Sequence, residues 1–158
     1  MNPTDFLRYV EERYDDVVLD DAWGEQGLFY NPGGRLPRGT YFVTVKDRDS
    51  ENDSASHLYR DDVWRVNFGV SEATYRRLFG ARPERPPKGD VVDTGHDFTT
   101  VDELLPHPVY GWAGWVSVVS PSETTVETVL RPLLDEAYDR AGAQFAKRVA
   151  SASVNNSQ

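Results

Sequence analysis

The sequence predicts an α+β fold, an antiparallel sheet with the N- and C-terminal helices packed on one face. Period-two runs of β-branched and aromatic residues gather in the middle of the chain, whereas apolar residues recur at helical spacing near its two ends. Short turn signals between the central runs are typical of hairpins. Strand runs with helices gathered at the ends favour one sheet covered on one face.

The length and composition indicate one domain. A chain near ~150 residues buries roughly 70% of its unfolded surface, and this one has 158 residues, 39% of them hydrophobic. We expect a single domain over 1–149 and a disordered tail over 150–158, where the residues are small and polar. The absence of cysteine excludes disulfides and thiolate metal sites, and it fits a cytoplasmic location.

The net charge of −9 disfavours nucleic acid and anionic lipid as partners, because both are densely negative. No apolar run approaches the ~18–20 residues that cross a bilayer, so no membrane association is expected. A small molecule or a protein is the expected partner. Residues 63–88 differ from the rest of the chain, with six basic side chains against two acidic ones.

The first predicted element is a helix over residues 4–14, where apolar side chains recur at helical spacing. Thr4 is expected to cap its first amides, and Asp5 lies at the positive end of the helix dipole. Four strands follow. They are predicted at 17–19, 28–30, 40–45 and 63–70, with a strong turn signal at 31–34 and a long mobile loop at 46–56.

The strand at 63–70 has two distinct faces. Alternation places Val66 and Phe68 toward the core, and it places Arg65 and Asn67 on the opposite face. We include Arg65 and Asn67 among the candidate ligand-binding residues.

The C-terminal half begins with a helix that Ser71 caps and Gly80 ends. A Pro-rich exposed loop follows over 81–95, and a short helix is expected within 98–105. A last strand is predicted at 115–119. The final helix begins near Thr124, and Pro132 inside it is expected to produce a kink.

Two stretches carry a family resemblance. The first is RVNFGVS at 65–71, followed by TY at 74–75 and LFG at 78–80; the second is LLPHPVY at 104–110, followed by GWVSV at 114–118. Together they resemble a family of prokaryotic proteins of unknown function. The resemblance brings no established active site, so no catalytic residue is carried over.

More distantly, the order of elements is similar to that of the MmcQ/YjbR-like proteins, whose compact α+β sandwich resembles that of the frataxin-like CyaY proteins. This likeness implies the fold, and DNA binding as suggested for some relatives. The chain departs from it by lacking a lysine-rich face. A DNA-binding surface here would require Arg65, Arg76, Arg77 and Arg82 on one exposed face.

His107 is the first candidate for chemistry, because flanking prolines restrict its backbone. As an acid or base it would act with Tyr110 and an acidic neighbour such as Asp102. The alternative is that His107 hydrogen-bonds a backbone carbonyl and stiffens the chain before the last strand, which we favour. Its separation from His96 matches no familiar ligand spacing, so neither a metal site nor a cofactor is expected.

Aromatic residues are the second candidate. Tyr110, Trp112 and Trp115, with Trp23 and Trp64 from elsewhere in the chain, are of the type that lines an apolar pocket. Trp64 and Trp115 lie in strand patterns and also suit the core, so Tyr110 and Trp112 are the preferred ligand-binding residues.

The sequence therefore leaves the function unknown, with three hypotheses open. We prefer a non-catalytic module that binds a small ligand or a protein, because neither a nucleophile elbow nor a phosphate-binding loop is present. The alternatives are an enzyme using the His107 loop and a DNA-binding protein.

Overall fold

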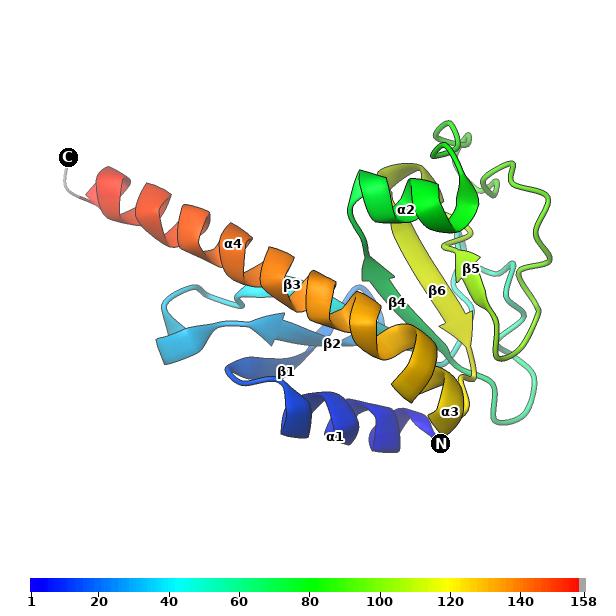
Figure 1. The fold of residues 1–158 in the computed structure, drawn as a ribbon, viewed down its shortest axis with the longest axis horizontal. Coiled ribbons are helices and arrows are strands. Elements are labelled where there is room, and N and C mark those ends of the chain that lie inside the picture. The colour runs from blue at the N-terminus through cyan, green and yellow to red at the C-terminus, as the bar shows by residue number, and fades with distance from the viewer. Residues whose placement is uncertain (157–158) are drawn as a thin grey trace.

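The computed structural model describes residues 1–156 (Figure 1). The elements in chain order are α1 (Pro3–Arg13), β1 (Val17–Ala22), β2 (Glu25–Tyr30), η1 (Pro32–Gly34), β3 (Thr40–Lys46), β4 (Arg65–Gly69), α2 (Glu72–Phe79), β5 (Leu104–Pro106), η2 (Gly111–Ala113), β6 (Trp115–Val119), α3 (Glu123–Thr125), the π-turn η3 (Val126–Leu130) and α4 (Arg131–Asn156). Residues 157–158, the end of the predicted tail, lie outside the described residues.

The strands form one antiparallel sheet in the order β1-β2-β3-β4-β6-β5, which confirms the predicted fold class. One face of the sheet meets both terminal helices. Phe6 and Val10 of α1 and Leu134 of α4 join one core with Val66 and Phe68 of β4. The predicted division of β4 into two faces follows, since alternate residues of a strand point to opposite sides.

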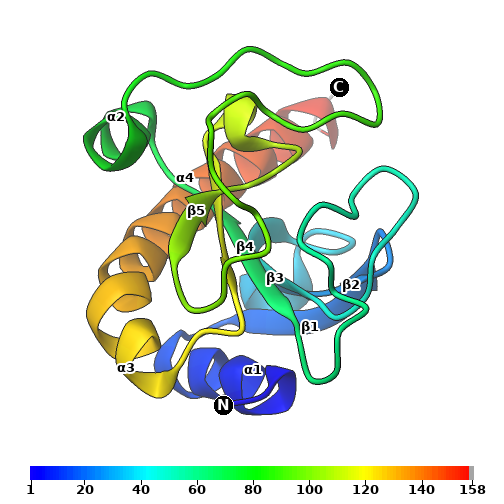
Figure 2. The ribbon, with the colours of Figure 1, turned by 90° about the vertical axis from the view of Figure 1, so that its right-hand side faces the viewer.

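The second face of the sheet is covered as well, by loops. Arg65 and Asn67 of β4 point to this side, and both are completely buried. Asp53 and Ser56 of the loop 47–64 accept hydrogen bonds from Arg65, and this loop lies across β4 from α4 (Figure 2). This loop was predicted to be long and mobile. It is long, and hydrogen bonds from Arg60 Nη2 to the carbonyl oxygens of Ser56 and Thr99 anchor it.

A bulge in β3 shapes this second face. The pairing with β2 shifts between Leu28, opposite Val43, and Phe29, opposite Tyr41. The extra residue places Tyr41 and Thr44 on the same side, although residues three apart in a regular strand point to opposite sides. Their hydroxyl oxygens lie 3.3 Å apart.

The prediction of a short helix within 98–105 is wrong. The chain turns at Asp102, whose φ is +63°, and then forms β5, which pairs with β6. Strand pairing satisfies the backbone here, and the carboxylate of Asp102 accepts a hydrogen bond from the Ser122 amide at 2.7 Å.

The C-terminal helix begins at Glu123, capped by Ser122, close to the predicted start at Thr124. The π-turn over Val126–Leu130 ends two residues before Pro132, the residue predicted to kink the helix. Proline lacks an amide donor, and such wide turns are a usual cause of helix distortion.

The predicted disordered tail is helical in its described part, because α4 continues through 150–156. After Gly142 no proline or glycine interrupts the chain, so nothing stops the helix there. Within residues 1–156, no helix is both long and apolar enough to cross a membrane.

The cap of α1 gives a first prediction. Asn2, and not Thr4 as expected from the sequence, accepts the Asp5 amide at 2.8 Å, and Asp5 reciprocates toward the Asn2 amide. Because this capping box satisfies two otherwise unpaired donors, Asn2→Ala is expected to cost about 1 kcal/mol of unfolding free energy. Chemical denaturation measures it. Thr4→Ala is the matched control, and an equal loss in both variants would contradict the assignment.

Candidate functional site

A pocket of about 250 Å³ opens on the loop-covered face of the sheet. Its lining residues are Trp23, Glu25, Tyr41, Thr44, His107, Tyr110 and Trp115. Tyr41 and Thr44 come from β3, and Glu25 begins β2. Trp23 comes from the β1–β2 turn, His107 and Tyr110 come from the segment between β5 and β6, and Trp115 begins β6, so the pocket draws on parts of the chain far apart in sequence.

The floor of the pocket rests on the buried guanidinium of Arg65. Its Nη1 donates to Asp53 Oδ1 at 2.9 Å, and its Nη2 donates to Asp53 Oδ2. Its Nη1 also donates to Ser56 Oγ at 3.0 Å, and its Nε donates to Asn67 Oδ1 at 2.6 Å. Such a two-point ion pair fixes the direction of both side chains, so Arg65 ties loop 47–64 to β4.

The same network reaches the pocket wall at Glu25. Asn67 Nδ2 and Thr44 Oγ1 both donate to Glu25 Oε1, at 2.9 Å and 3.1 Å. Burial raises the pKa of the Glu25 carboxyl, and the charges of Lys46 and Arg65 oppose this only in part. Glu25 is thus a partly desolvated carboxyl group whose hydrogen bonds from Asn67 and Thr44 both fall on Oε1.

Asp53 behaves in the opposite way. Burial alone would raise its pKa, but the hydrogen bonds and charge of Arg65 outweigh burial, so the pKa of Asp53 is lowered. The Arg65–Asp53 pair is therefore ionised at neutral pH.

His107 is buried, and Nδ1 is the accepting nitrogen of its ring. Its Nδ1 accepts the amides of Val109 and Tyr110 at 3.1 and 3.0 Å, and its Nε2 lies 3.3 Å from Arg65 Nη2. Burial and the Arg65 charge hold the pKa of His107 well below its ordinary value, so the ring is neutral. The ring fixes the turn before β6, much as the favoured interpretation expected, although it accepts from amides where a bond to a carbonyl was predicted.

Other predicted site residues are distributed differently. Tyr110 and Trp115 line the pocket beside His107, as does Trp23. Trp112 lies outside it, where the Arg85 guanidinium stacks 4.8 Å from the ring centre. Asp102 binds the Ser122 amide and is not one of the lining residues.

Arg65 and Asn67, predicted to contact a ligand, lie beneath the pocket and support its wall. Trp64 is a core residue, with its ring 5.8 Å from that of Phe6. The arginine face required for the DNA-binding hypothesis does not form, because Arg65 is completely buried. In the part of the chain that the structure describes, no cluster of three or more possible metal ligands is found.

Four site residues were missed from the sequence: Glu25, Tyr41, Thr44 and Asp53. Glu25 lies in a strand, and Asp53 lies in a charged loop. Neither position carries a periodic signal that separates it from other acidic residues. A bulge reverses the facing of Tyr41 relative to Thr44, and bulges leave no reliable trace in sequence.

Trp23 is held in an unusual backbone conformation. It forms the two-residue β1–β2 turn with Gly24, and both residues have positive φ, as type I′ turns require. Asparagine is preferred at this position, and a bulky residue with positive φ is strained. Trp23 is nonetheless 70% exposed at the rim of the pocket.

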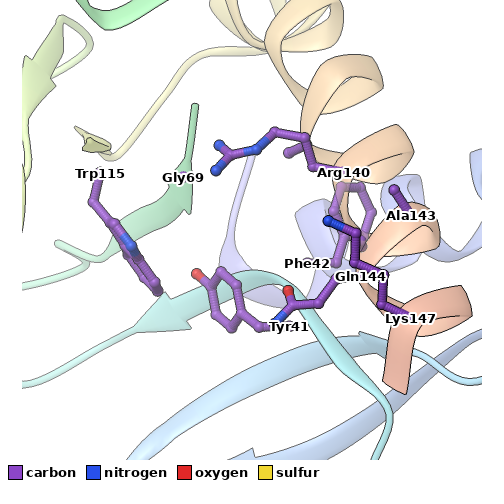
Figure 3. A pocket seen from close by; sticks show the side chains of 10 residues that line it. Tyr41, Phe42, Gly69, Trp115, Arg140, Ala143, Gln144 and Lys147 are labelled. Atoms are coloured by element: carbon purple, nitrogen blue, oxygen red, sulfur yellow. The ribbon is translucent and has the colours of Figure 1, made fainter. Parts of the chain in front are cut away.

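A second hollow, of about 520 Å³, lies behind the same aromatic wall, between α4 and the ends of β3 and β4. Pairing of β3 with β4 stops at Thr44–Asn67, although both strands continue beyond this point. Arg140, Gln144 and Lys147 of α4 line the hollow. Figure 3 shows the Arg140 side chain reaching toward Gly69, with Tyr41 and Trp115 on the opposite side. We call this hollow the basic groove.

The family of unknown function DUF6194 matches residues 1–150. The chain belongs to this family. The match confirms the resemblance seen in the sequence, whereas the distant likeness to MmcQ/YjbR-like proteins gains no support from it. No curated protein and no solved structure matches the chain.

The ion pair beneath the pocket gives a second prediction. Asp53→Asn leaves the Arg65 charge buried without a carboxylate, which is expected to cost about 3 kcal/mol of unfolding free energy at neutral pH. Because the folded-state pKa of Asp53 is lowered, its contribution is present above the unfolded pKa and is lost as pH falls through the folded one. The difference between wild type and variant is therefore expected to shrink in acid.

Urea denaturation as a function of pH measures this difference. Asp47→Asn is the control on the same loop, since its pair with Arg48 is exposed and is expected to contribute little. Equal stabilities of the Asp53 and Asp47 variants would show that the buried pair is not a structural requirement.

Proposed function

We propose that this protein binds a small organic molecule in the pocket formed by Trp23, Glu25, Tyr41, Thr44, His107, Tyr110 and Trp115, without transforming it chemically. The observation that carries the proposal is a largely aromatic pocket whose polar groups are held in place by a buried hydrogen-bond network. Small-molecule sites are typically apolar hollows with a few polar groups in fixed positions.

The free-energy cost of burying the network supports the proposal. Removing a guanidinium and a carboxylate from water costs several kcal/mol each, which their mutual attraction only roughly repays. A hydrophobic pair in place of Arg65 and Asp53 would stabilise the sheet equally well. Arg65 instead orients Asn67, which in turn orients Glu25 in the pocket wall. A site fixed before binding loses less conformational entropy when the ligand arrives.

The state of the titratable groups favours binding over acid–base catalysis. His107 is neutral, and two backbone amides occupy Nδ1, its accepting nitrogen. Burial raises the pKa of the Tyr41 phenol well above its ordinary value, and its hydroxyl donates to the Asn67 carbonyl at 2.7 Å. These groups are therefore better suited to shaping a pocket than to exchanging protons with a substrate.

Trp23 provides the third prediction, in which one substitution weakens ligand binding but does not lower stability. Trp23→Asn converts the turn to Asn-Gly, the preferred type I′ pair, so the melting temperature is expected to hold or rise. Ligand binding is expected to weaken, because one aromatic wall of the pocket is lost. Saturation-transfer NMR with a library of small fragments measures binding, and calorimetry measures the melting temperature.

Tyr59→Asn is the control, because Tyr59 is an equally exposed aromatic residue that does not line the pocket. We expect fragments to bind wild type and the Tyr59 variant alike, and to bind the Trp23 variant more weakly. A library that yields no fragment bound in the pocket of the wild type, or one whose hits ignore Trp23, would overturn the proposed function.

A further inference from the structure

The aromatic rings of the pocket are arranged around a small volume. The Tyr41 and Trp115 rings lie 4.5 Å apart between centres, and their position side by side is visible in Figure 3. Tyr110 lies 5.9 Å from Trp115 on the pocket side, and Trp23 completes the rim. Ring faces carry partial negative charge, so several of them around one space attract a cation.

Glu25 is the one acidic side chain among the lining residues, all of which lie in the described part of the chain. The hydrogen bonds from Thr44 and Asn67 both fall on Oε1, so Oε2 is the oxygen that remains for a ligand. The wall thus combines electron-rich rings with a single negative charge.

The charges behind the wall do not cancel this preference. Arg65 is neutralised by Asp53 in a bidentate pair, and His107 carries no charge. Lys46 is buried, with its ammonium 3.0 Å from Ser50 Oγ, and it is not a lining residue. The acidic and aromatic groups are therefore the ones that a ligand contacts.

We propose that the ligand of this pocket carries an organic ammonium group, with its alkylated nitrogen against the rings of Tyr41, Trp115 and Tyr110 and its charge balanced by Glu25. The inference rests on the proposed function and specifies the chemical class of the ligand. Aromatic cages of this kind are the usual protein solution for quaternary and methylated ammonium groups, which form few hydrogen bonds.

Burial of Glu25 fits this assignment. Its pKa is raised in the empty pocket because water is partly excluded from the carboxylate. A bound cation would supply the missing stabilisation of the charged form. Among the neighbouring charges, Lys46 and Arg65 attract Glu25 and Asp53 repels it. Cation binding is expected to weaken as pH falls through the raised pKa of Glu25, because protonation removes the negative charge of its carboxylate.

The experiment compares choline with 3,3-dimethyl-1-butanol, a neutral molecule of the same shape in which carbon replaces the charged nitrogen. Binding of each to the full chain is measured by NMR titration and by quenching of tryptophan fluorescence. Choline is expected to bind at least about tenfold more tightly, because cation–π attraction and Glu25 act on it alone.

Two variants assign the effect to the pocket. Glu25→Gln keeps an oxygen that accepts from Thr44 and Asn67, so it is expected to fold. It is expected to weaken choline binding about tenfold, to leave the neutral isostere unchanged and to abolish the pH dependence. Glu51→Gln is the control, because it removes the same charge from an exposed position on the neighbouring loop.

The outcomes separate the two proposals. Equal affinity for choline and the neutral isostere, or insensitivity of choline binding to Glu25→Gln, overturns the ammonium assignment and leaves an apolar ligand in the same pocket. No response to choline at millimolar concentration also overturns it. The fragment library then decides the proposed function on its own.

Discussion

The buried charge of Arg65 is the constraint on which the loop-covered face of the sheet depends. A guanidinium on a central strand has five N–H donors, and the interior of the protein must satisfy them. Asp53, Ser56 and Asn67 accept four of these hydrogen bonds, and the remaining edge faces His107. A loop that supplies two of these acceptors must lie against the sheet, which explains why residues 47–64 cover a face that antiparallel sheets often expose.

That constraint also explains why the two faces of the sheet bury different kinds of side chain. The helix-covered face contains the apolar cluster that any α+β domain requires to fold. The loop-covered face contributes little of that apolar burial and collects the buried polar groups, among them Thr44, Lys46, Asn67, His107 and Ser117. Polar burial of this kind specifies positions more than it stabilises them. The pocket lies on this loop-covered face, where buried hydrogen bonds fix the positions of the side chains.

The sequence predicted those features that have a period. Alternation located β3, β4 and β6, with β6 at its observed limits, and it assigned the two faces of β4 correctly. It gave no sign that Arg65 is buried, because its partner Asp53 lies twelve residues away in a charged loop without periodicity. His107 and Tyr110 were found because prolines and an aromatic cluster mark them. Glu25 was missed because an acidic residue in a hairpin is ordinary until its neighbours in space are known.

Tyr41 and Trp115 line both hollows. They form the wall of the acidic aromatic pocket on one side and of the basic groove, with Arg140 and Lys147, on the other. The two hollows therefore have two side chains in common. Whatever tilts the rings from one side changes the free energy of occupancy on the other, and thermodynamic reciprocity requires the effect to be equal in both directions.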